Sequence, residues 1–87
     1  MRNQYSRRVK VFHIAQVCGA MPSDWTITDV LQYLGTPTRA FEGSRMASYG
    51  WSVEYHHRLY SVRVAYEKKT GIIIGKAGNA ERGLKWN

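Results

Sequence analysis

Residues able to contact phosphates and DNA bases gather in two short stretches of this chain. The first stretch is 36–45, which begins Thr-Pro-Thr-Arg, and the second is Glu67-Lys68-Lys69. Guanidinium, ammonium and hydroxyl groups donate hydrogen bonds to phosphate oxygens, and guanidinium groups also match guanine edges. We therefore expect DNA contacts from Thr36, Thr38, Arg39, Glu42, Arg45, Lys68 and Lys69.

Two short helices meeting at a sharp corner are expected to position the first stretch. Thr28 is the predicted N-cap of the first helix, whose apolar stripe is Val30, Leu31 and Leu34. Gly35 can end that helix, and the following Thr36-Pro37 predicts an N-cap with proline at the first helical position. Helices joined by so few residues cross steeply, as in a helix-turn-helix.

The second of these helices, about residues 37–49, would be the recognition helix in the major groove. Helical spacing places Thr38, Arg39, Glu42 and Arg45 on its outer face and turns Ala40, Phe41, Ser44 and Ala47 inward. Gly43 would cost about 1 kcal/mol relative to alanine in a helix, which suggests that it permits a close approach.

A further helix is expected before this pair and strands after it. Apolar residues from Val9 to Gly19 recur at helical spacing, although their β-branched content leaves a strand open over 9–14. Period-two alternation predicts strands over 51–55 and 60–66, then an extended run over 72–74 after a charged turn whose tip carries Lys68 and Lys69. The order predicts an α+β winged helix: a three-helix bundle with a helix-turn-helix, followed by a two- or three-stranded antiparallel β-wing.

The segments Trp25-Thr26-Ile27-Thr28-Asp29-Val30, Leu34-Gly35, Arg39-Ala40-Phe41 and Trp51-Ser52-Val53 resemble winged helix-turn-helix transcriptional regulators. More narrowly, they are similar to the small CaiF/GrlA-type activators, over roughly residues 10–66. The chain departs from that pattern by Leu34 where those proteins carry Phe, by Pro37, and by Gly43 within the second helix. The resemblance implies sequence-specific binding of double-stranded DNA and regulation of transcription.

Size and charge agree with one small domain that binds a polyanion. The 87 residues carry 13 Lys and Arg against 6 Asp and Glu, a formal charge of +7. We expect a basic arm over 1–8, the folded domain over 9–76 and a flexible tail over 77–87. No apolar run is long enough to span a membrane, and the single Cys18 suits a reducing cytoplasm. A homodimer or a second regulatory protein would be needed to enlarge the small contact with DNA.

Two other functions are compatible with the sequence. A protein-interaction module on the same scaffold would use Trp51, Trp86 or an edge of the ribbon. An RNA- or single-strand-binding domain would stack bases on Tyr60 and Tyr66, but their parity with Val62 and Val64 places both on the core face. Arg2, Arg7 and Arg8 could enter a minor groove. His56-His57 is expected in a loop between strands, and no motif predicts an enzyme, a metal or a cofactor.

Overall fold

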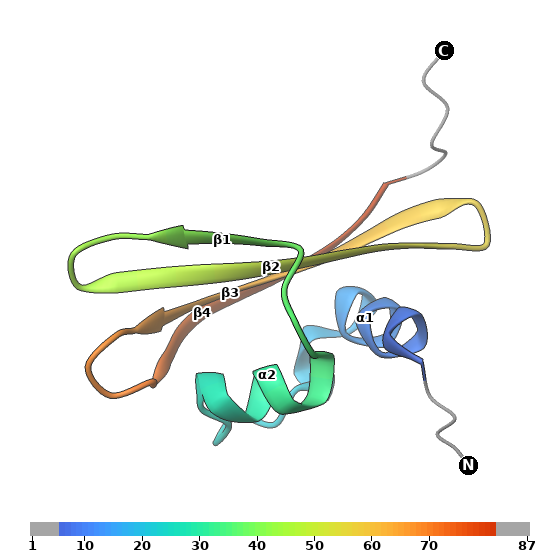
Figure 1. Cartoon of the computed structure of the whole chain (residues 1–87). Coiled ribbons are helices and arrows are strands. Elements are labelled where there is room, and N and C mark those ends of the chain that lie inside the picture. The colour runs from blue at the N-terminus through green and yellow to red at the C-terminus, as the bar shows by residue number, and fades with distance from the viewer. Residues whose placement is uncertain (1–5, 82–87) are drawn as a thin grey trace.

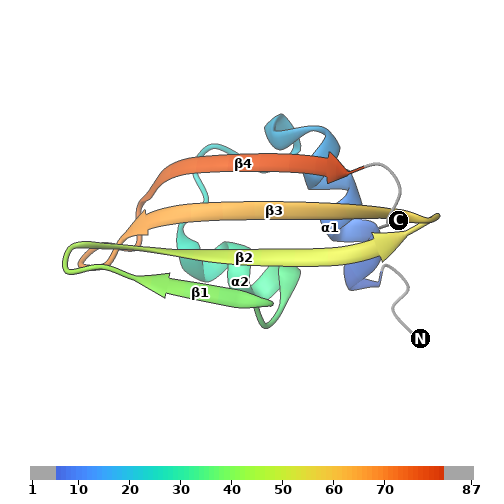
Figure 2. The same ribbon diagram turned by 90° about the horizontal axis from the view of Figure 1, so that it is seen from above.

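The computed structural model describes residues 6–81, with side-chain detail to residue 78, as two helices packed on one face of a four-stranded antiparallel sheet. The helices are α1 (Arg7–Gln16) and α2 (Ile27–Leu34), with a short 3-10 turn, η1 (Cys18–Ala20), between them. The strands are β1 (Arg39–Glu42), β2 (Met46–Tyr55), β3 (Arg58–Glu67) and β4 (Ile73–Glu81). They lie side by side in chain order, and both helices lie on the same side of them (Figures 1 and 2).

This architecture contradicts the predicted winged helix. The described residues contain two α-helices rather than a three-helix bundle, and residues 37–49 form β1, a turn and the start of β2 rather than a recognition helix. The reason lies in Ala47 and Tyr49, which share the parity of the buried Trp51 and extend its strand backwards to Met46. Packing of that inward face outweighs the weak helical spacing of the same residues.

A tight turn at Gly43 joins β1 to β2. The Gly43 N–H donates to the Met46 carbonyl at 2.8 Å, and a Cβ on Gly43 would lie 2.9 Å from that oxygen. The backbone approaches Gly43 closely within this turn, and the helix in which Gly43 was expected does not form.

Helix α2 begins and ends close to the predicted residues. Its N-cap is Thr26 rather than Thr28, and the Asp29 carboxylate accepts hydrogen bonds from the Thr26 backbone N–H at 2.9 Å and from its hydroxyl at 3.2 Å. Gly35 ends the helix with a φ of 82°, and its carbonyl accepts a hydrogen bond from the Trp51 indole at 3.0 Å.

The core lies between the helices and the inward face of the sheet. Trp51 is fully buried at its centre, and α1 packs across β2, β3 and β4. Buried apolar side chains from both layers surround it, namely Val11, Ile14, Met21, Ile27, Val30, Leu34, Tyr60, Val62 and Val64.

The ordered elements also extend beyond the predicted domain bounds. Helix α1 begins at Arg7, within the predicted arm, so Arg7 and Arg8 belong to a helix; Arg2 lies outside the described residues. Strand β4 runs to Glu81, past the predicted boundary at 76, because Gly78 and its neighbours pair with β3. The remainder of the predicted tail, with Leu84 and Trp86, lies outside the described residues.

Candidate nucleic-acid interface

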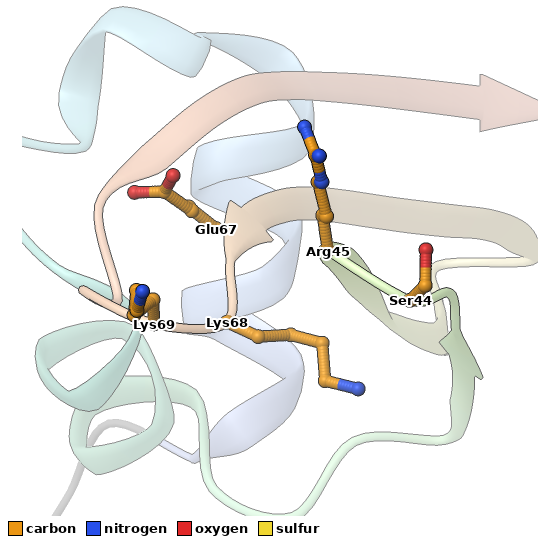
Figure 3. A pocket seen from close by; sticks show the side chains of 5 residues that line it. All are labelled: Ser44, Arg45, Glu67, Lys68 and Lys69. Carbon is orange, nitrogen blue, oxygen red and sulfur yellow. The ribbon is translucent and has the colours of Figure 1, made fainter.

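Two turns at one end of the sheet bring together three basic residues that the sequence placed in different elements. We call Arg45, Lys68 and Lys69 the hairpin cluster; Arg45 ends the β1–β2 turn, and the lysines begin the β3–β4 turn (Figure 3). The Lys68 N–H donates to the Arg45 carbonyl at 3.0 Å, and its ammonium donates to the Gly43 carbonyl at the same distance. These bonds hold the turns together around a hollow of about 590 Å³.

Carboxylates offset much of the charge of the hairpin cluster. The Lys68 ammonium pairs with Glu42 at 2.6 Å, and hydrogen bonding and attraction to Lys68 lower the pKa of Glu42 below its usual value. Glu67 also lines the hollow, where its carboxylate accepts a hydrogen bond from the Thr70 hydroxyl at 2.7 Å. Glu42, predicted to face DNA, is therefore a partner of Lys68, and the cluster alone is a weak anion site.

The second group of candidate residues lies on the face of the sheet that carries no helix, which we call the open face. Parity places Ser48, Gly50 and Ser52 of β2 on this face, since Ala47 and Trp51 point to the helices. Register places Arg39 of β1 and Arg63 of β3 on either side of Gly50. Two guanidinium-bearing side chains thus flank Gly50, which has no side chain.

Arg63 and Phe41 meet across the intervening strand β2. The Arg63 guanidinium lies over the Phe41 ring, 5.4 Å from its centroid, although the residues belong to β3 and β1. The path between them crosses only Ser48 and Gly50, so small side chains on β2 make the contact possible.

A shallow hollow of about 300 Å³, which we call the open-face trough, lies among these groups. Gly50 forms part of its lining, and a Cβ there would lie 3.4 Å from Cγ of Arg39. Further side chains that line it are Arg39, Phe41, Ser52, Leu59, Ser61 and Arg63.

The open-face arginines have no acidic partner among the side chains that the structure describes. Within that part of the chain the one ion pair is Lys68–Glu42. Arg39 and Arg63 are both exposed, so their charge faces solvent.

The structure therefore divides the seven predicted contact residues. Glu42, Arg45, Lys68 and Lys69 come together at the turns, and Arg39 lies on the open face. Thr36 is an exposed residue of the connection between α2 and β1. Thr38 has a structural role, since its N–H donates to the Gly50 carbonyl at 2.7 Å and its hydroxyl accepts from the Ser52 N–H at 3.1 Å.

Sequence reasoning missed the importance of Phe41, which was expected to point inward. Half of its surface, 51%, is exposed. Alternation could not have found it, because residues 41 and 51 are both odd-numbered and Phe41 reaches the open face only through its pairing with Ser48 across the turn. Arg63 was not among the predicted contact residues either.

The two tyrosines that an RNA- or single-strand-binding domain would use for base stacking lie on the other face. Tyr60 is 4% exposed beneath α1, where its ring meets that of Phe12, and Tyr66 is partly buried against Tyr49. This confirms the parity argument that placed both tyrosines on the core side.

His56 and His57 form the turn between β2 and β3, as expected, with φ values of 51° and 64°. Cys18 is a half-buried free thiol in η1. Among residues 6–81, no three His, Cys, Asp or Glu side chains gather as metal ligands would.

The described helices are all too short or too polar to cross a membrane. No family model, curated protein or solved structure matches this chain.

Proposed function

We propose that this protein binds nucleic acid through the open face of its sheet, with the hairpin cluster touching the adjoining phosphate backbone. The observation that carries the proposal is the pair Arg39 and Arg63, exposed on the open face without acidic partners among the described side chains. The formal charge of +7 supports a polyanionic ligand.

Geometry favours a ligand with repeated negative charges. Because neighbouring strands lie about 4.8 Å apart, the backbones of Arg39 and Arg63 are separated by roughly 10 Å across β2. Guanidinium groups bind phosphates with two parallel hydrogen bonds, so two of them can hold two phosphates of one chain.

Insertion of a helix from residues 37–49 into the major groove has no place in this proposal, since those residues are strands and a turn. Antiparallel sheets and ribbons also bind nucleic acids, by laying strands along the ligand. Regulation of transcription, which the sequence resemblance implied, would require duplex DNA among the ligands.

Fluorescence polarisation with labelled duplex DNA and single-stranded oligonucleotides, at about 50 mM and 200 mM salt, tests the proposal. We expect affinity to fall as salt rises. Replacing both Arg39 and Arg63 by Ala should weaken binding at low salt at least about tenfold and reduce the salt slope by about two, because two phosphate contacts disappear.

The matched control replaces Arg8 and Arg58 by Ala, which removes the same charge. Arg8 lies on exposed helix surface, and Arg58 has the parity of the core side of β3. We expect only a small loss from this pair. Absence of binding to every nucleic acid, or equal losses in the two double variants, would refute the proposal.

A further inference from the structure

We infer that the open face takes a single-stranded segment of nucleic acid, with one base stacked on Phe41 and the neighbouring phosphates on Arg39 and Arg63. This inference rests on the proposed function and specifies its ligand. It begins from the composition of the open face, which combines cationic side chains with exposed apolar ones.

Three of the exposed large apolar side chains lie on this face or at the end of the sheet that carries the hairpin cluster. Phe41 and Met46 are each 51% exposed and Ile74 is 52% exposed. Met46 pairs with Glu67 in register, and Ile74 is the extra residue where the β3–β4 register shifts. Both line one hollow of about 560 Å³ with Arg45. A phosphate backbone alone would leave these apolar groups without a favourable contact.

The trough also has a size and lining suited to a planar ring. Its volume of about 300 Å³ is at the lower end for small-ligand sites. Gly50, Ser52 and Ser61 keep its floor low, while Phe41 and Leu59 supply apolar surface. Hydroxyl groups of Ser52 and Ser61, 3.3 Å apart, offer hydrogen bonds to a base edge.

Phe41 offers an exposed ring for stacking beside Arg63. The Arg63 guanidinium lies over the ring, 5.4 Å from its centroid, while half of the Phe41 surface stays open to solvent. Aromatic rings and guanidinium planes both stack on unpaired bases. Bases inside a duplex are stacked on one another, so only an unpaired base can present a full face to Phe41.

The hollows follow one direction along the strands. The trough lies near the middle of β2 and β3, Phe41 is beside Ser48, and the hollow of Met46 and Ile74 lies toward the hairpin cluster. A single strand crossing β2 at Gly50 would meet both arginines, with Phe41 and then the apolar surface beside Arg45 on the side of the hairpin cluster.

The test compares Phe41→Leu with Phe41→Trp, using single-stranded oligonucleotides and duplex DNA. Phe41→Leu keeps an apolar side chain but removes the ring, so single-strand binding should weaken between about fivefold and 150-fold. Phe41→Trp should retain binding, and its added fluorescence should be quenched by single strands. Duplex binding should change little in either variant.

Because Phe41 is half exposed, both variants should fold, which circular dichroism checks. Single-strand affinity unchanged in Phe41→Leu, or no quenching of Phe41→Trp by bound single strands, would overturn the stacking site. Duplex binding without single-strand binding would also overturn it while leaving the proposed function intact. Failure to bind single-stranded or duplex nucleic acid would refute both the stacking site and the proposed function.

Discussion

At the scale of single residues, the pair Tyr49 and Tyr66 shows how the fold changes side-chain chemistry. Their rings lie 5.4 Å apart on the inward face of the sheet. Hydrogen bonding with Tyr49, and then burial, raises the pKa of Tyr66 from 10 to about 12. Folding thus favours the neutral phenol.

Alkaline conditions should therefore destabilise the native protein through Tyr66. A folded-state pKa above the unfolded value gives a stabilisation that is complete below pH 10 and is lost as pH rises toward about 12. Urea unfolding of wild type and Tyr66→Phe across this interval measures it. The variant should lose less stability than wild type across this interval, and parallel losses in the two proteins would contradict the expectation.

At the scale of elements, Gly78 sets how closely α1 approaches β4. A Cβ at this position would lie 2.4 Å from the Ala15 carbonyl oxygen and 2.7 Å from its Cα. Both obstacles are backbone atoms, so the helix or the strand would have to move.

Gly78→Ala should consequently lower the free energy of unfolding by about 1–3 kcal/mol, the usual range for overpacking. Chemical denaturation followed by circular dichroism measures the loss. Gly75→Ala is the control, because a Cβ on Gly75 meets nothing within 4 Å on the same strand. Equal stability of the two variants would show that the backbone of α1 at Ala15 leaves room for a side chain at position 78 of β4.

Several helices and strands follow from local sequence patterns alone. The first helix was expected from Val9 and begins at Arg7, while Gly35 ends the second as predicted. Alternation around Trp51 and Val62 also predicted the central two strands. These elements were predictable because their apolar spacing extends over several residues.

Residues 37–49 were mispredicted because the local signals conflict. Thr36-Pro37 imitates a helix start, while the four-residue β1 is too short for alternation to be decisive. Whether Phe41 faces the core or solvent depends on its pairing with Ser48, a contact made only after folding. The basic residues of the site were predictable from their charge, whereas their separation into the hairpin cluster and the open face was not.

At the scale of the whole molecule, one tryptophan connects the two layers. Trp51 is fully buried in β2, and its indole N–H donates to the Gly35 carbonyl at the end of α2. A domain of this size buries a modest core, so its stability depends strongly on each large side chain.

Trp51→Ala should cost about 3–5 kcal/mol, a large part of the 5–15 kcal/mol typical of a folded domain. We expect loss of cooperative thermal unfolding or a steep fall in Tm, measured by circular dichroism. Trp25→Ala, at a half-buried position, serves for comparison and should retain a cooperative transition. A Trp51→Ala protein as stable as wild type would place the core elsewhere.

The chain order of helices before strands has a consequence for protein synthesis. Ribosomes release the N-terminus first, so α1 and α2 emerge before the strands that cover Val11, Ile14 and Val30 have left the exit tunnel. Helices of 10 and 8 residues have little independent stability in water. The nascent polypeptide therefore exposes apolar side chains until β2 and β3 have left the exit tunnel. During this period these side chains offer a binding site to chaperones.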